Sequence, residues 1–188
     1  MTNPHPFKSE KMQTVTVTTD QQLEKSQTQF ERTRLRSMLD KLEQRINPGF
    51  PITFKDGMKL YDGEISMINN AIFDANKYLL TPATADEIAD QFSLLSGGMR
   101  LPKDMDSTSA AQAYTIALSG ISSFAIRQSV FLIIRGKAEG FNKTFMPTAP
   151  ELAAFCRKLE ENEWENIKGA ERFIKAAYEQ NARDANKQ

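Results

Sequence analysis

The sequence is poor in the residues that bind metals and form disulfide bonds. Its 188 residues include one cysteine, Cys156, and one histidine, His5. A single cysteine excludes an intramolecular disulfide, and the two residues together cannot supply the ligands of an ordinary zinc site. Cys156 falls on the apolar face of an expected helix, where an inert, buried thiol is the simplest interpretation. We therefore expect no metal and no cofactor.

The chain also lacks an excess of charge of either sign. Its 24 lysines and arginines balance 24 aspartates and glutamates, so the formal net charge is zero. This balance removes any general attraction to nucleic acids or anionic membranes, although a local basic patch can still bind phosphates. The N-terminus has no signal-peptide pattern, and the longest apolar run, around Val130, is too short to cross a bilayer. We expect a soluble, cytoplasmic protein with no membrane association.

Signatures of catalysis are missing as well. Gly97 and Gly98 are the only adjacent glycines, and no lysine follows them as a phosphate-binding loop requires. His5 lies in a segment with no expected core, which leaves no histidine for a Ser-His-Asp or Cys-His relay. Asp86 and Asp90 are spaced by one helical turn, but the helix dipole explains a carboxylate at a helix start. We expect a protein that is not an enzyme.

Three helices separated by clear stops are expected within residues 107–159. Ser109 is a candidate N-cap of the first helix, with a glutamine three residues later as in a capping box, and Gly120 suits its end. The second helix is expected to start at Ser122 or at the serine after it, and to stop at Gly136 after a basic residue. Its last turns are apolar on every side, which is typical of a helix in the middle of a bundle.

The third helix of this stretch has the strongest start signal. Thr148 is a good N-cap, Pro150 lies in the first turn where its missing amide is not needed, and Glu151 completes a capping box. The same pattern occurs at Thr84 and Glu87. General rules of helix capping explain the likeness, and a true internal repeat is the alternative.

The whole chain is expected to be all-α: an antiparallel helical bundle with a long N-terminal helix and a disordered N-terminal arm. Short helices joined by short turns predict the antiparallel packing. A start poor in large apolar residues predicts the arm, and an Asn-Pro-Gly-Phe-Pro run ends the long helix. The predicted segments are a disordered arm at residues 1–20, an amphipathic helix at residues 21–46, a linker or short hairpin at residues 47–63, the bundle at residues 64–182 and a frayed tail at residues 183–188.

An acidic run occupies residues 160–165 and surrounds the only tryptophan, Trp164. Such a run is typical of a solvated helix face. The apolar residues that follow predict a C-terminal helix, and the sequence leaves open whether it is continuous with the preceding one across Gly169.

A group of cations is expected around the exit of the central helix. Arg127 and Arg135 belong to that helix, Lys137 follows it, and Lys143 lies in the loop that leads to Phe145. These five are the candidate partner-binding residues, because cations bind phosphates or an acidic partner and a loop aromatic residue can contact one. The plain alternative is that the cations are solvated at a helix C-terminus and that the loop aromatics anchor the loop to the core.

The segment that leads into the third helix resembles small helical proteins of tailed bacteriophages and prophages. Some of these are similar to helicase-loader or replication-accessory proteins. The resemblance covers residues 79–159 and implies a helical module, without an active site, that binds a replicative helicase or initiator inside a bacterial host. It is carried by Arg135-Gly136, a polar loop and Phe145-Met146-Pro147-Thr148-x-x-Glu151-Leu152, after an Ala/Tyr-rich helix and an Ala-Ile-Arg helix.

The leading expectation is a non-enzymatic phage or prophage accessory protein that acts by protein–protein binding in DNA replication. One alternative is an oligomeric structural or assembly protein of a phage, with residues 21–46 forming the contact between subunits. Another is a nucleic-acid-binding helical protein that uses Arg127, Arg135 and Lys137. The zero net charge counts against this last alternative.

Overall fold

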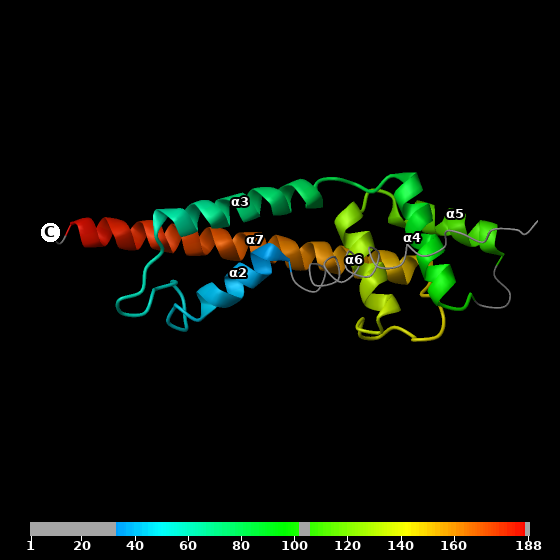
Figure 1. The fold of residues 1–188 in the computed structure, drawn as a ribbon, viewed down its shortest axis with the longest axis horizontal. Helices are drawn as coiled ribbons and strands as arrows, with labels where there is room; N and C mark the ends of the chain where they lie inside the picture. Colours follow the sequence, from blue (N-terminus) through cyan, green and yellow to red (C-terminus); the bar gives the residue numbers. More distant parts are fainter. Residues whose placement is uncertain (1–32, 102–105, 187–188) are drawn as a thin grey trace, which may run out of the picture. The chain divides into compact units, whose positions relative to one another are not determined.

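The structure, a computed structural model, describes residues 33–101 and 106–186. Within these ranges the chain forms six α-helices and no strand, so the expectation of an all-helical protein is confirmed there (Figure 1). The chain divides after Thr33 into two units, and all the described helices belong to the second. These helices are α2 (Arg34–Glu43), α3 (Asp62–Leu79), α4 (Ala85–Gly98), α5 (Ser107–Leu118), α6 (Ser123–Ile134) and α7 (Ala149–Ala185).

The bounds of the first and last helices differ from those that the sequence predicted. The arm predicted for residues 1–20 and the first part of the helix predicted for residues 21–46 lie outside the described residues. The part that is described, α2, ends at Glu43, and a turn follows it. At the other end α7 is continuous across Gly169 and runs to Ala185, so the predicted frayed tail at residues 183–188 is helical up to that residue.

Helix α7 is the element against which most of the others pack. It is 37 residues long and contacts α2, α3, α5 and α6 (Figure 1). Its first half buries Leu152 and Cys156 against α5 and α6, and its second half buries Ile167 and Phe173 against α2 and α3. One amphipathic helix thus supplies an apolar side to two clusters of buried residues, since its apolar positions recur over its whole length.

We call these clusters the α2–α3 core and the α4–α6 core. Phe124, at the start of α6, is half-buried and packs against both of them. Its ring lies 4.5 Å from the ring of Tyr78 on α3. The α2–α3 core includes Leu35, Leu39, Leu42, Leu60, Ile65, Ile68, Ala75, Leu79, Ile167, Phe173 and Ile174, and the α4–α6 core includes Ile88, Leu95, Tyr114, Leu118, Ile126, Val130, Ile133, Leu152 and Cys156.

The helix starts expected from capping signals are confirmed at α4, α6 and α7. Thr84 and Thr148 each form a complete capping box with the glutamate three residues on, and the Ser122 hydroxyl accepts from the Ala125 amide. The start of α5 was predicted wrongly. The Asp106 carboxylate caps this helix and accepts from both the amide and the hydroxyl of Ser109, so Ser109 lies inside the first turn.

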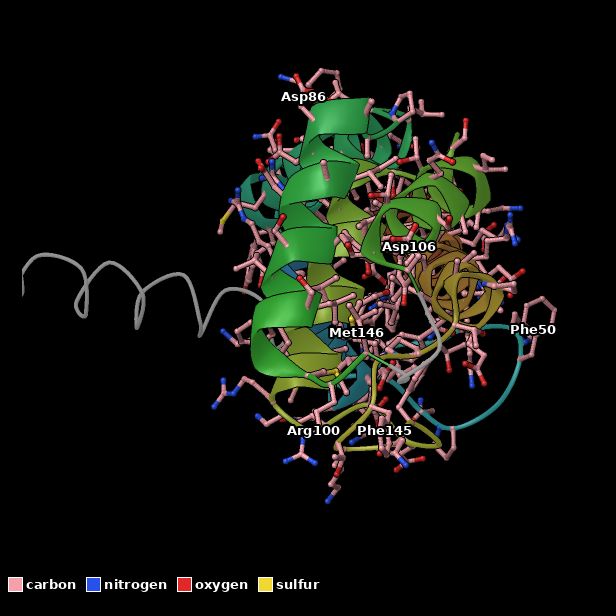
Figure 2. All side chains as sticks on the ribbon, turned by 90° about the vertical axis from the view of Figure 1, so that its right-hand side faces the viewer. Phe50, Asp86, Arg100, Asp106, Phe145 and Met146 are labelled. Carbon is pink, nitrogen blue, oxygen red and sulfur yellow. The ribbon has the colours of Figure 1, made fainter. Side chains whose placement is uncertain are left out.

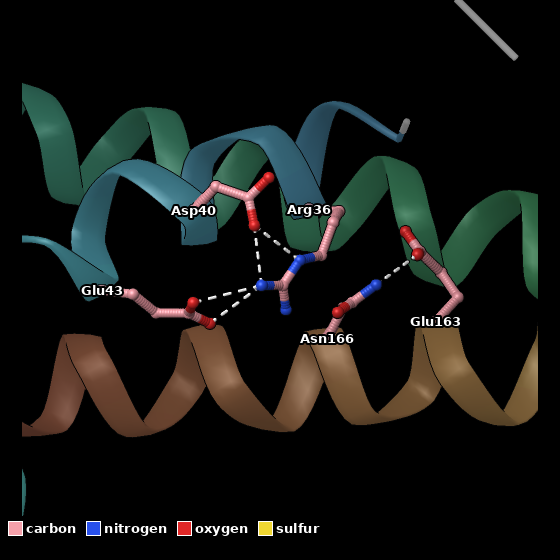
Figure 3. A network of polar contacts seen from close by, with 5 residues as sticks. All are labelled: Arg36, Asp40, Glu43, Glu163 and Asn166. Atoms are coloured by element: carbon pink, nitrogen blue, oxygen red, sulfur yellow. Dashed lines mark hydrogen bonds and ion pairs between the residues drawn. The ribbon is translucent and has the colours of Figure 1, made fainter. Parts of the chain in front are cut away.

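The interpretation of residues 160–165 as a solvated face is wrong for Glu163 and only partly right for Glu160. Glu163 is 3% exposed, and its carboxylate accepts hydrogen bonds from the Tyr78 hydroxyl and from the Asn166 side chain at 2.7 Å. Figure 3 shows Glu163 and Asn166 on α7 beside α2, where Arg36 binds Asp40. The neighbouring Glu160 accepts a hydrogen bond from the Ser122 amide at 2.7 Å, so this part of the acidic run faces other elements.

The connectors are held by isolated backbone bridges. Ile46 pairs with Phe54 in an antiparallel bridge that closes residues 47–53. The segment predicted as a linker or short hairpin at residues 47–63 forms no strand, and its last two residues belong to α3. Pro82 pairs with Ser122, which fixes the α3–α4 connector to the α5–α6 connector. The third bridge, Arg100 with Phe145, positions the candidate site.

Removal of one N-cap should measurably destabilise the protein. In a Thr148→Ala variant the Glu151 amide loses its acceptor, and we expect the unfolding free energy to fall by about 1 kcal/mol in urea titrations. The matched control is Thr108→Ala, at an exposed position inside α5, which should change it by less than about 0.5 kcal/mol. Equal effects of the two substitutions would contradict a structural role for the α7 cap.

The capping carboxylates should also make the stability depend on pH in acid. Hydrogen bonds from the amide and hydroxyl of Thr148 hold the pKa of Glu151 below its ordinary value of 4.5, and the Thr84 amide is the main cause of the lowered pKa of Glu87. Because the folded-state pKa is the lower one, this stabilisation is complete above the unfolded-state pKa and is lost as the pH falls through the folded value.

The unfolding free energy should therefore decline as the pH is lowered from about 5 to 3. A Glu87→Gln, Glu151→Gln double variant should show a shallower decline over the same range. Urea titrations at several pH values measure both slopes, and an unchanged slope in the double variant would assign the acid sensitivity to other carboxylates.

Candidate functional site

The ends of α4 and α6 meet the loop that leads into α7. The Arg100 amide donates to the Thr144 carbonyl at 2.8 Å, and the Met146 amide donates to the Arg100 carbonyl at 3.0 Å. Figure 2 shows Arg100 and Phe145 together at the end of α4 opposite Asp86. We call this surface, formed by residues 99–101 and 135–147, the loop end.

The loop itself is tightly ordered by local bonds. Gly136 has a φ of 65°, which lets the chain turn out of α6 where other residues would be strained. The Asn142 side-chain oxygen accepts from the amides of Thr144 and Phe145 at 2.7 and 3.0 Å. These bonds hold the backbone on both sides of Lys143, which sets the direction in which the side chains of this segment leave it.

The two aromatic residues of the loop behave differently. Phe141 is half-buried, and its ring lies 5.0 Å from that of Phe155 in an edge-to-face contact, so its interpretation as an anchor holds. Phe145 is 44% exposed, although the residues after it, Met146 and Pro147, are buried. The anchor interpretation therefore fails for Phe145.

Tyr114 anchors the C-terminal end of the loop to the α4–α6 core. It is buried in the α4–α6 core, and its hydroxyl donates to the carbonyl oxygen of Pro147. Burial, with a smaller contribution from the negative charge of Glu151, raises the pKa of Tyr114 to about 12. The phenol therefore keeps its proton, and this hydrogen bond, throughout the physiological pH range.

An open groove of about 490 Å³ lies between the loop and the first turns of α7. Its volume falls within the range of about 300–1,000 Å³ that is usual for ligand sites. Phe145 stands at this groove, and the lining is mainly apolar with a few charged side chains. The lining includes Glu139, Phe141, Asn142, Phe145, Met146, Pro147, Glu151, Ala154, Phe155 and Lys158.

The structure separates Arg127 from the other candidate cations. Its guanidinium binds the Glu87 carboxylate at 2.5 Å, and the same oxygen accepts from the Ser123 hydroxyl. Arg127 precedes Arg135 by eight residues, which is about 12 Å along a helix. It faces the start of α4, whereas the loop end lies at the exit of that helix.

The remaining cations lie together at the loop end. Arg135 lies over the ring of Phe131 at 5.2 Å, Lys137 follows two residues later, and the aliphatic chain of Lys143 lies against Gly136. All three are exposed. The structure adds Arg100, which is also exposed. Its bridge to Phe145 joins residues 45 positions apart, so no local pattern predicted its place here.

A metal cluster and a membrane-spanning helix are both absent from the described part of the chain. Within residues 33–101 and 106–186 no group of three or more histidine, cysteine, aspartate or glutamate side chains is placed to hold a metal ion. None of the described helices combines the length and apolar character needed to cross a membrane. Comparison of the chain with protein-family models, curated proteins and solved structures gives no match.

The order of the loop should depend on the side chain of Asn142. In an Asn142→Ala variant the amides of Thr144 and Phe145 lose their acceptor, so their hydrogen exchange should accelerate, and the unfolding free energy should fall by about 1 kcal/mol. Exchange measured by NMR provides an internal control, since the Met146 amide donates to Arg100 and should be less affected. Asn142→Asp keeps an acceptor and should preserve protection, and unchanged exchange in the alanine variant would contradict the assignment.

Proposed function

We propose that this protein is a non-enzymatic helical bundle that acts by binding another protein through the loop end. The observation that carries the proposal is Phe145, an aromatic side chain that is 44% exposed on an ordered loop beside an open groove. Loop bonds, the bridge to Arg100 and the buried Pro147 hold its backbone in place.

An exposed, well-positioned aromatic residue suits protein recognition for two physical reasons. Its large apolar surface gains free energy when a partner covers it, and aromatic residues contribute strongly to measured interfaces. A backbone already fixed before binding also loses less conformational entropy on association. The groove offers a place for a partner side chain to pack against Met146 and Phe155.

The class of partner follows from the resemblance of residues 79–159. That stretch provides α4, α5, α6 and the first turns of α7, which together position the loop end. A replicative helicase or an initiator, of phage or host, is the partner that this resemblance implies. We propose a phage or prophage replication accessory, and these two are the first partners to test.

Self-association through residues 21–46 has less support. In α2, the described part of that segment, Leu35, Leu39 and Leu42 are buried in the α2–α3 core. This apolar face is buried against other helices of the same chain, so it cannot contact a second subunit. An assembly role would therefore have to use residues other than these three leucines.

The proposal predicts that one substitution at the loop end removes partner binding. Phe145→Ala should lower recovery of replication proteins from a host lysate, or from phage-infected cells, by about tenfold, because the partner loses a central apolar contact. Quantitative mass spectrometry of affinity-captured material measures the loss. The matched control is Phe73→Ala on α3, which removes a phenylalanine that is 70% exposed away from the loop end.

Two results would contradict the proposal. Equal recovery with the wild type and the Phe145→Ala variant would exclude the loop end as the binding surface. Recovery of phage head or tail components, without any replication protein, would replace the replication role with an assembly role.

A further inference from the structure

We propose that the loop end selects an acidic protein segment that carries an apolar side chain, with the acidic residues on the cations and the apolar side chain in the groove beside Phe145. This inference rests on the proposed function and names the chemistry of the segment that would bind. It is drawn from the charges and the apolar lining that the structure brings together there.

The cations of the loop end outnumber its carboxylates. Arg100, Arg135, Lys137 and Lys143 are all exposed there, and Glu139 is the one acidic residue in the sequence between positions 135 and 147. Because the chain as a whole has zero net charge, this local excess is a property of the site. Like charges gathered on one surface favour a partner of opposite sign and speed its approach.

The second carboxylate of the groove is already engaged. Glu151 completes the capping box of α7, where its carboxylate accepts from the amide and hydroxyl of Thr148 at 2.7 and 2.8 Å. These bonds stabilise the ionised carboxylate, so Glu151 keeps its negative charge and counts with Glu139 as the second carboxylate facing the cations of the loop end. Lys158, which also lines the groove, contributes a further cation.

The apolar part of the site sets the second requirement. The groove is lined by four apolar side chains, those of Phe145, Met146, Pro147 and Phe155. Burying an apolar side chain there gains free energy in proportion to the area removed from water. A purely acidic segment would leave this surface uncovered, so the favoured ligand combines carboxylates with at least one apolar side chain.

Nucleic acid fits the same surface less well. Binding by phosphate contacts draws its affinity from many neutralised phosphates, whereas the loop end supplies four cations. The apolar groove would also have to be filled by an unstacked base, and Phe145 is the one exposed aromatic residue among the described residues that line it, whereas the Phe141 and Phe155 rings meet edge to face.

The experiment uses the full chain and four fluorescent peptides of equal length. They combine acidic or basic residues with or without one central phenylalanine, and a single-stranded oligo-thymidine serves as a fifth probe. We expect the acidic peptide with phenylalanine to bind about tenfold tighter than any other peptide in anisotropy titrations, with affinity that falls as salt is added.

A double charge reversal tests the cations directly. Arg100→Glu with Lys143→Glu should weaken the acidic peptide by about tenfold and improve binding of the basic peptide with phenylalanine. The matched control is Lys77→Glu with Lys175→Glu, two exposed lysines on α3 and on the second half of α7. Urea titrations of both variants verify that they fold.

Other outcomes overturn this inference and are distinguishable from failure of the proposed function. Equal affinity for acidic and basic peptides would refute charge selection, and tightest binding of the oligo-thymidine would assign the cations to nucleic acid. Either result can coexist with loss of a captured partner in the Phe145→Ala variant, which tests protein binding itself.

Discussion

The apolar side of α7 is the constraint on which the rest of the described structure depends. A helix of 37 residues is about 55 Å long, and an isolated helix gains little stability in water without tertiary packing. Helices α2 and α3 cover its second half, while α5 and α6, with α4 packed on them, cover its first half. Neither core is complete without α7, so both groups of helices depend on this one element.

The two cores are joined by a polar contact as well as by an apolar one. Phe124 packs against both, and Tyr78, whose ring lies beside it, donates to the buried carboxylate of Glu163 on α7. A buried carboxylate without partners would be strongly destabilising, and Asn166 supplies a second donor. Other registers of α3 along α7 would separate these groups, so the network favours one alignment of the two helices.

Sequence patterns predicted those features that depend on residues close together in the chain. The caps at Thr84 and Thr148 and the stop at Gly136 follow from residues within one turn. The start of α5 was missed because an aspartate three residues before the expected cap accepts from the amide of that residue, Ser109, and so begins the helix earlier. Glu163 was misjudged because its partner Tyr78 is 85 residues away, a pairing that no local pattern records.

The same distinction explains how much of the site could be predicted. Phe145 and three of its cations lie near one another in the sequence, whereas Arg127 is held elsewhere by Glu87 and Arg100 joins through a distant backbone bridge. That bridge, together with the hydrogen bond from buried Tyr114 to Pro147, fastens the loop to α4 and α5. The surface that would meet a partner is therefore positioned by the α4–α6 core, and a loop held in this way can be as well ordered as the helices that carry it.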